Sequence, residues 1–335
     1  MRPPTRFPDR DFVADVRVEA ETLEDGAESP DLRRLAGRVM ARRDMGKLVF
    51  LDLVDRSGRI QLLCPAARTG EISVKLGDVV GVVGHPAKSR RGEPSLIVDE
   101  LEVLSEIKAS LPDTFHGMTD VEARYRRRYL DLLMNEETRS DFIFRARLTS
   151  ALRRQLDAAG FVEVETPVLQ AQYGGAFGRP FLTHHNQLAQ DLYLRIALEL
   201  PLKRLIVGGL EKVYEIGKVF RNEGVDYKHN PEFTMLEWYE AYVDYRDTME
   251  RFEQLIAGVA EELLGTTVVE WRSHTIDLEP PWKRLKLVDA LQEHGVWSED
   301  EAELRALLEA KGVDTTNDKT WSLLIDHALT NYVEP

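Results

Sequence analysis

The sequence contains a single cysteine, Cys64, among its 335 residues. One cysteine excludes an internal disulfide and a cysteine metal cluster, and the neighbouring residues 60–64 are typical of a strand, so a small buried side chain is the expected role. The chain also lacks an apolar run long enough to cross a bilayer, and residues 1–8 lack the apolar core of a signal peptide. These absences predict a cytoplasmic protein.

Basic residues are fewer than acidic ones, 44 against 58, which gives a net charge of −14. This total argues against a nucleic-acid partner, since phosphate contacts need Lys and Arg. The basic residues are clustered, however: residues 33–47 hold six of them against Asp44 alone, and a second cluster follows at 124–128. A solvated face is the usual explanation of such clusters, so neither one by itself predicts RNA binding.

The composition, 43% hydrophobic and 30% charged, is that of a globular chain, and 335 residues exceed what one core usually serves. We predict an α+β protein of two domains, 1–108 and 121–335, joined by a linker at 109–120. In the first domain, short strands separated by Gly-rich turns predict a five-stranded OB-fold barrel. The expected strands are 35–42, 48–55, 59–64, 79–83 and 96–104.

Phe50 alternates with Leu48 and Asp52 along the second expected strand. This spacing favours a position on the strand 2–3 face, where OB-folds bind oligonucleotides and where an aromatic ring stacks on a base. An ordinary core phenylalanine is the alternative.

The second part of the chain has longer elements. Apolar residues at helical spacing predict a helix over 141–159, with Gly160 as its C-cap, followed by a strand over 161–167 that ends at Pro167. From Asp244 onward the pattern predicts helices only, including one that starts with a capping box at Ser298.

The most informative stretch is Phe220-Arg221-Asn222-Glu223, followed by a charged loop and then 229–239, which reads His-Asn-Pro-Glu-Phe-Thr-Met-Leu-Glu-Trp-Tyr. The two-residue strand period predicts an antiparallel hairpin with Arg221 and Glu223 on one face. On the return strand Phe233, Met235, Glu237 and Tyr239 share a face. A guanidinium donates to two phosphate oxygens at once, and a phenyl face stacks on a base.

This string resembles motif 2 of the class II aminoacyl-tRNA synthetases, and the order of its residues resembles that of the class II lysyl-tRNA synthetases in particular. The helix and strand that end at Pro167 are similar to motif 1, through which these enzymes form homodimers. Residues 37–61 are similar to their anticodon-binding OB-fold domain. The resemblance implies a lysine–tRNA ligase that uses ATP and Mg²⁺, forms a lysyl-adenylate and transfers the lysyl group to tRNA.

The resemblance also implies site residues. Arg221 would be the catalytic residue, and no metal ligand is expected before Pro335. The ATP-binding residues would be Arg221, Glu223, His229, Asn230 and Phe233. The lysine-binding residues would be Gly175, Glu199, Glu237 and Tyr239. The anticodon contacts would be Arg43, Phe50, Gln61 and Glu100.

Three alternatives stay open. Glu199 has a possible salt-bridge partner in Lys203 or Arg204, which lie four and five positions further on. His184 and His185 suggest a metal site, but neighbouring strand residues point to opposite faces, so a role in a polar loop is preferred. Finally, the string typical of motif 3 is not found before Pro335, so we expect a chain that activates lysine poorly. A non-catalytic RNA-binding paralogue and a ligase that modifies proteins are the alternative functions.

Overall fold

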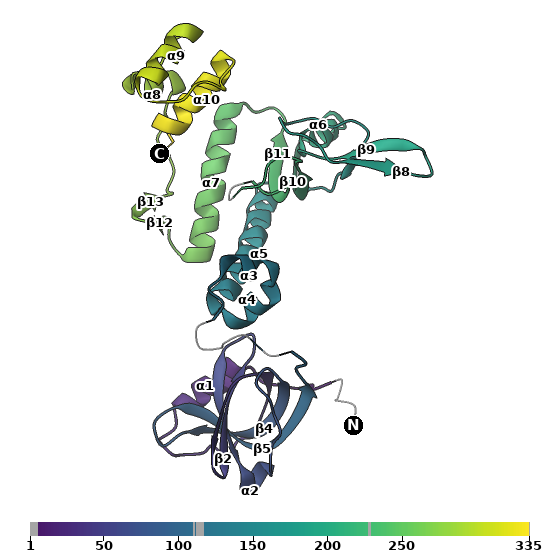
Figure 1. Cartoon of the computed structure of the whole chain (residues 1–335), viewed down its shortest axis with the longest axis vertical. Helices are drawn as coiled ribbons and strands as arrows, with labels where there is room; N and C mark the ends of the chain where they lie inside the picture. Colours follow the sequence, from purple (N-terminus) through teal and green to yellow (C-terminus); the bar gives the residue numbers. More distant parts are fainter. Residues whose placement is uncertain (1–5, 110, 112–116, 227–228, 335) are drawn as a thin grey trace. The chain divides into compact units, whose positions relative to one another are not determined.

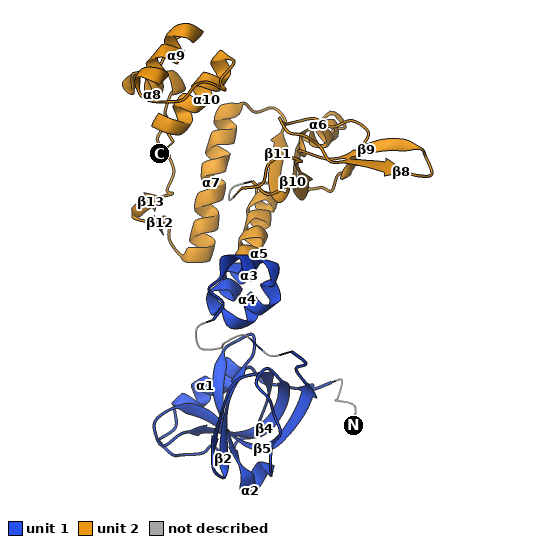
Figure 2. Cartoon of the chain, in the orientation of Figure 1, with its two compact units in different colours: residues 1–144 blue, residues 145–335 orange. Residues whose placement is uncertain are grey.

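The computed structural model describes residues 6–109, 111, 117–226 and 229–334. The chain forms two compact units, Met1–Phe144 and Arg145–Pro335, which Figure 2 colours blue and orange. Within the predicted linker 109–120, positions 110 and 112–116 lie outside the described residues. The predicted domain limits stay a prediction.

The first unit contains the predicted barrel. Five strands close in the order β1-β2-β3-β5-β4, and β3 and β5 pair in parallel (Figure 1). Alternation builds its core: on β3 the side chains of Ile60, Leu62 and Cys64 point inward. The predicted burial of Cys64 is confirmed, and burial raises the pKa of its thiol to about 12. The strands are β1 (Arg33–Met45), β2 (Leu48–Val54), β3 (Arg59–Pro65), β4 (Val79–Lys88) and β5 (Pro94–Ser105).

Two helices beside the barrel strands were not predicted. Helix α1 (Val13–Glu21) packs Val13 and Val16 into the barrel core, and α2 (Ala66–Thr69) is a single turn after β3. Valines have low helix propensity, and the N-cap residue of α1, Phe12, makes no side-chain cap hydrogen bond. The sequence therefore carries little local signal for α1, which is held by packing.

In the second basic cluster Arg126 and Arg127 are exposed, as expected of a solvated face, but the other two arginines are not. Arg124 of α3 (Val121–Arg126) donates to the fully buried carboxylate of Asp131 at 2.8 Å, and Arg128 pairs with the same group. Asp131 belongs to α4 (Arg128–Met134), which precedes α5 (Glu136–Ala158). Arg124 and Arg128 are therefore engaged in ion pairs that hold the helices together.

The second unit is built on a hairpin. β10 (Lys212–Phe220) and β11 (Glu232–Glu240) pair antiparallel, and the short β6 (Val162–Glu163) adds in parallel to β10. Helices cover both faces of the hairpin (Figure 1): α5 and α7 (Tyr245–Leu264) pack on Tyr214, and α6 (Glu199–Val207) packs on Val213 and Val219. A second sheet has the order β7-β9-β8, from β7 (Leu169–Gln170), β8 (Leu182–His185) and β9 (Gln190–Leu194).

Two details of the predicted motif 1 region can now be compared. The helix is confirmed and runs from Glu136 to Ala158, and Gly160 has the left-handed φ of +82° that a C-cap glycine takes. The strand is shorter than predicted, because only Val162 and Glu163 find a ladder partner, in β10.

The prediction of helices alone after Asp244 is wrong. The strands β12 (Val268–Trp271) and β13 (His274–Asp277) form a hairpin there, and α9 (Glu301–Ala310) is capped by Asp300 rather than by Ser298. A last cluster of helices encloses its own core, which includes Leu291, Leu308 and Leu324. These helices are α8 (Leu287–Glu293), α9 (Glu301–Ala310) and α10 (Trp321–Tyr332). Within the described ranges, no helix has the length and apolarity needed to span a membrane.

Candidate functional site

A cavity of about 270 Å³ opens where the β10–β11 hairpin turns. We call it the hairpin cavity. It gathers all five residues that the sequence predicts for ATP, together with Gly224 and Pro231. Its lining consists of Arg221, Glu223, Gly224, His229, Asn230, Pro231 and Phe233.

Strand β10 ends at Phe220, so the predicted alternation of strand faces does not extend to Arg221 and Glu223. The connection places both side chains at the cavity instead. The Arg221 amide donates to Pro231 O at 2.9 Å, its Nε donates to Ile196 O at 3.4 Å, and its guanidinium lies 5.3 Å from the centre of the Phe233 ring. Backbone and ring contacts therefore hold the guanidinium at the cavity wall.

A loop between the two sheets closes on the same connection. The Asn222 amide donates to Arg179 O at 2.7 Å, and the Arg179 amide donates to Glu223 Oε1 at 3.2 Å. Gly178 lies against Arg221, since a Cβ built on Gly178 would approach Arg221 Cδ to 3.3 Å. Arg179 was not among the predicted site residues.

The His229 side chain is 68% exposed. Its amide donates to Asp226 Oδ1 at 2.8 Å, and its Nδ1 lies 2.7 Å from Asp226 Oδ2. Because Nδ1 is engaged, Nε2 is the ring nitrogen left for a ligand. Residues 227 and 228 of this predicted charged loop lie outside the described residues.

The chemistry of the cavity suits a nucleotide. A guanidinium and an imidazole are donors for phosphate oxygens, and a phenyl ring is a stacking surface for a base. Among the described residues of the cavity lining, Glu223 is the single carboxylate. Across the described residues, no group of three or more His, Cys, Asp or Glu side chains is arranged to hold a metal ion, and His184 instead bonds Asp191.

Glu237 lies on β11, on the face that also carries Phe233 and Tyr239, as the strand period predicts. Its Oε1 accepts from the Leu198 amide at 2.9 Å and its Oε2 accepts from the Tyr239 hydroxyl at 3.1 Å. Burial, with the nearby charges of Glu237 and Glu199, raises the pKa of Tyr239. The phenol therefore stays protonated and donates to the Glu237 carboxylate.

Glu199 begins α6 next to this group. The salt bridge that the sequence left as an alternative does form: Lys203 Nζ lies 2.5 Å from Glu199 Oε1 and 5.9 Å from the centre of the Tyr239 ring. Gly175 has a φ of +88°, and a Cβ there would meet Glu199 Cβ at 2.8 Å, so only glycine fits. We call Gly175, Glu199, Glu237 and Tyr239 the acidic group.

On the barrel, three of the four predicted anticodon residues lie on one outer face. Arg43 pairs with Phe50 across β1 and β2, with its guanidinium 6.0 Å from the ring, and Gln61 is on the neighbouring β3. The side chain of Leu51 points into the barrel core, so that of the neighbouring Phe50 points outward, and Phe50 is half-buried. Phe50 is therefore not an ordinary core phenylalanine. Glu100 pairs with Val83 of β4, three positions beyond the last β5 residue that pairs with β3, and its anticodon contact stays a prediction.

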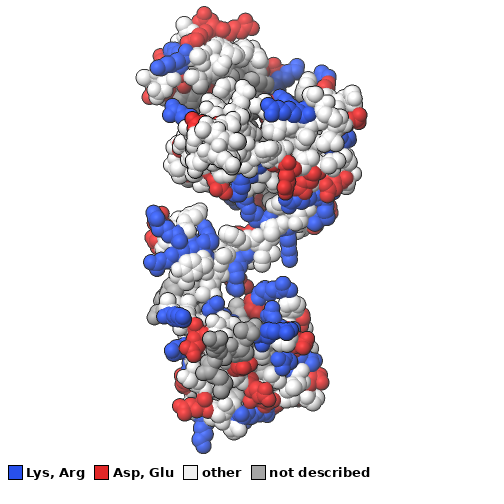
Figure 3. Space-filling model, turned by 90° about the vertical axis from the view of Figure 1, so that its right-hand side faces the viewer, with Lys and Arg blue, Asp and Glu red and all other residues white. Residues whose placement is uncertain are grey.

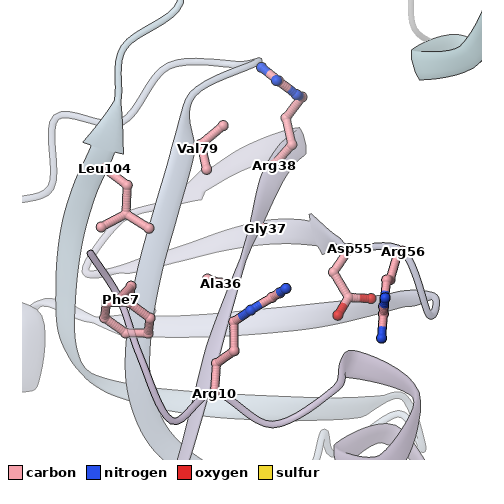
Figure 4. A pocket seen from close by; sticks show the side chains of 9 residues that line it. All are labelled: Phe7, Arg10, Ala36, Gly37, Arg38, Asp55, Arg56, Val79 and Leu104. Atoms are coloured by element: carbon pink, nitrogen blue, oxygen red, sulfur yellow. The ribbon is translucent and has the colours of Figure 1, made fainter. Parts of the chain in front are cut away.

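A second hollow, of about 430 Å³, lies on the barrel between β1, β4 and the β2–β3 turn. It carries Arg10, Arg38 and Arg56, but Figure 4 shows Arg38 extending away from the other two. The Arg38 guanidinium donates to Gly77 O, and the arginines do not converge on one point. Basic and acidic side chains are interspersed over the barrel in the view of Figure 3, so the net charge of −14 does not make this surface uniformly acidic.

Comparison with known proteins agrees with this arrangement. Residues 34–104 match the OB-fold nucleic acid binding domain, and residues 120–328 match the tRNA synthetases class II (D, K and N). The chain therefore belongs to the class II tRNA synthetase family.

Within that family, the chain is similar to proteins named lysine–tRNA ligase. It is 48% identical to that of Shouchella clausii over 325 residues, which cover 94% of this chain and 65% of the relative. It is 43% identical to that of Dehalococcoides mccartyi strain 195, over 99% of this chain and 69% of the relative. The chain thus spans about two thirds of the length of the curated relatives that it matches.

Proposed function

We propose that this chain acts in the ATP-dependent ligation of lysine to tRNA. The observation that carries the proposal is the proximity of two sites of complementary chemistry. The hairpin cavity offers Arg221 and Phe233 to a nucleotide, and the acidic group offers Glu237 to an ammonium. One backbone segment, residues 196–198, touches both. The similarity to lysine–tRNA ligases favours lysine as the cation.

In the first step the lysine carboxylate attacks the α-phosphorus of ATP, and the bond to the departing pyrophosphate breaks. No side chain needs to act as a nucleophile, so positioning and charge stabilisation supply the catalysis. Arg221 bridges the α-phosphate and the carboxylate, His229 contacts the triphosphate, and Phe233 stacks on adenine. Glu223 and Asn230 fix the adenine and the phosphates.

In the second step a ribose hydroxyl of tRNA takes the lysyl group and releases AMP. Mg²⁺ would neutralise phosphate charge when bound. The described lining of the hairpin cavity fits the phosphates and base of ATP, but it provides no carboxylate cluster for the ion.

Lysine carries two ammonium groups, and the acidic group has two carboxylates. Glu199 is already paired with Lys203, whereas Glu237 accepts hydrogen bonds only from neutral groups, the Leu198 amide and the Tyr239 hydroxyl, among its described contacts. Glu237 and Tyr239 are thus the better placed pair for one ammonium, and Glu199 would exchange Lys203 for the other. Gly175 leaves room beside Glu199.

The tRNA partner would be read on the barrel. Phe50 would stack on an anticodon base, with Arg43 beside it and Gln61 bonding a base edge. Unpaired loop bases are read by contacts of this kind. A cytoplasmic location remains part of the proposal.

A homodimer through the motif 1 region is also proposed. Three consecutive apolar side chains of α5 are exposed, Phe142 and Ile143 at 50% and Phe144 at 43%, and so are Val162 and Leu169 in the following segment. Exposed apolar side chains of this kind suit a partner subunit. Sedimentation equilibrium should give twice the chain mass of 38.3 kDa, and a monomer mass at micromolar concentration would contradict the dimer.

Calorimetric titration tests the substrate assignment on this chain directly. L-Lysine should bind, whereas L-aspartate and L-asparagine should bind at least about tenfold more weakly, because their side chains place no cation at Glu237. Glu237→Gln should remove the preference. Equal affinity for the three amino acids would contradict lysine as the substrate.

A further inference from the structure

Resting on the proposed function, we propose that Arg195 is a positioning residue that sets the geometry of both substrate sites. Neither the sequence motifs nor the predicted site residues include it. It lies at the end of β9, just before the segment 196–198, and its side chain is 4% exposed. A buried arginine needs partners, and those it has explain the role.

The segment 196–198 is where the two sites meet. Ile196 O accepts from Arg221 Nε at 3.4 Å, and the Leu198 amide donates to Glu237 Oε1 at 2.9 Å. These residues belong to no strand or helix, so no ladder fixes them within the described part of the chain. A shift of this segment would move a phosphate-binding guanidinium and an ammonium-binding carboxylate together.

Arg195 anchors the start of that segment. Its amide donates to Val168 O at 3.0 Å and its carbonyl accepts from the Phe220 amide at 2.9 Å. Phe220 is the residue before Arg221, so the same residue also fixes the point at which Arg221 leaves β10. The backbone of Arg195 thereby joins the two sheets at the site.

The side chain of Arg195 fixes the position of its backbone. The Arg195 guanidinium donates to Lys218 O at 2.8 Å, to Thr166 O at 3.1 Å and to Glu215 Oε1 at 2.6 Å. Glu215 is 5% exposed and also accepts from the Thr166 hydroxyl at 2.6 Å. Gly217 leaves room for the guanidinium, because a Cβ there would overlap Arg195 Nη2.

A lysine cannot reproduce this arrangement. The guanidinium fork donates in three directions in one plane, whereas an ammonium is a point charge that pairs with Glu215 and releases the two carbonyls. Arg195→Lys should therefore keep the buried charge pair yet loosen the segment. The milder variant Thr166→Val removes one hydroxyl and leaves every charge in place.

The test combines two measurements on the full chain. Hydrogen–deuterium exchange of the ligand-free protein reports whether the segment 196–198 loosens, and calorimetry reports ATP and lysine affinity separately. Arg251→Met is the matched control, since the Arg251 guanidinium pairs at 2.7 Å with the Glu240 carboxylate, which is 7% exposed, and its described hydrogen bonds reach neither Arg221 nor Glu237.

We expect Arg195→Lys to speed exchange at 196–198 and to weaken ATP and lysine binding together, each by at least about tenfold. Thr166→Val should do the same to a smaller degree. Arg251→Met should lower the melting temperature while both affinities stay within about twofold of the parent. If Arg195→Lys and Thr166→Val leave exchange and both affinities as in the parent, or if Arg251→Met weakens binding equally, the positioning role is wrong.

The outcome separates the two proposals. Faster exchange at 196–198 in a protein whose parent binds neither ATP nor lysine would support the role of Arg195 and contradict the proposed function. Tight parental binding that survives Arg195→Lys would support the function and overturn the role of Arg195.

Discussion

Phe50 is the side chain that is predicted to stack on an anticodon base of the tRNA. It is half-buried on the outer face of β2, and the Arg43 guanidinium lies 6.0 Å from its ring. Stacking of a base on an aromatic ring contributes about 1–3 kcal/mol. Phe50→Ala should therefore weaken tRNA binding by about tenfold or more while leaving ATP and lysine binding unchanged, as filter binding and calorimetry would show.

Two matched variants sharpen this prediction. Phe50→Leu keeps apolar volume without the ring and should weaken tRNA binding nearly as much, because stacking needs the π face. Glu100→Gln tests the fourth predicted contact, on β5 opposite Val83, and should weaken tRNA binding less than Phe50→Ala because it removes a charge but no stacking surface. A loss of ATP affinity in Phe50→Ala would mean that the substitution disturbs the fold instead.

Single residues were predictable where their chemistry is specific. An arginine, a histidine and a phenylalanine in one ordered string indicated the hairpin cavity, and all five predicted residues line it. Arg179 and Arg195 were missed because they act through backbone bonds and buried pairing, which leave no local pattern. The one available signal for Arg195 was a charged residue between Leu194 and Ile196 in an otherwise apolar run.

At the scale of elements, a buried carboxylate joins three helices. Asp131 of α4 accepts hydrogen bonds from Arg124 of α3 at 2.8 Å and from Thr138 of α5 at 3.2 Å. Burial by itself would raise the pKa of Asp131, but hydrogen bonds from Asn135 and Arg124 outweigh it and lower the pKa below its ordinary value of 3.8. The charged form is thus the one that the fold stabilises.

Asp131→Asn should lower the free energy of unfolding by about 2–3 kcal/mol at pH 7. This loss is smaller than that expected for a fully buried ion pair, because the side chains of Arg124 and Arg128 are about one third exposed to solvent. A depressed folded-state pKa contributes stability above the unfolded-state pKa and loses it as the pH falls through the folded value. The difference between parent and variant should therefore shrink below about pH 4. Urea unfolding from pH 3 to 7 measures it.

Asp44→Asn is the control for this series. The Asp44 pKa is also lowered, by a hydrogen bond from Arg42, but Asp44 is exposed and its loss should change stability little. A pH-independent difference between Asp131→Asn and the parent would contradict the linkage argument.

Elements with a strong period were predictable and those with unusual turns were not. The five barrel strands and the β10–β11 hairpin follow from alternation. The β12–β13 hairpin was missed because its two-residue turn begins with Arg272 at a φ of +56°, where the sequence signal would be Asn or Gly. Its strands have only four residues each, too few to establish a period.

At the scale of the whole molecule, the two proposed tasks fall to different units. The barrel face of Arg43, Phe50 and Gln61 belongs to Met1–Phe144, whereas the hairpin cavity and the acidic group belong to Arg145–Pro335. Each unit has cores of its own. Substitutions in one site should therefore leave ligand affinity at the other unchanged.

The central claim is that the hairpin cavity and the acidic group together hold lysyl-adenylate. The most direct measurement is calorimetric binding of a stable sulfamoyl analogue of lysyl-adenylate, compared with its aspartyl counterpart. The lysyl analogue should bind, Arg221→Ala and Glu237→Gln should each weaken it by at least about tenfold, and the aspartyl analogue should bind far more weakly. Equal binding of both analogues, or parental affinity in both variants, would contradict the claim.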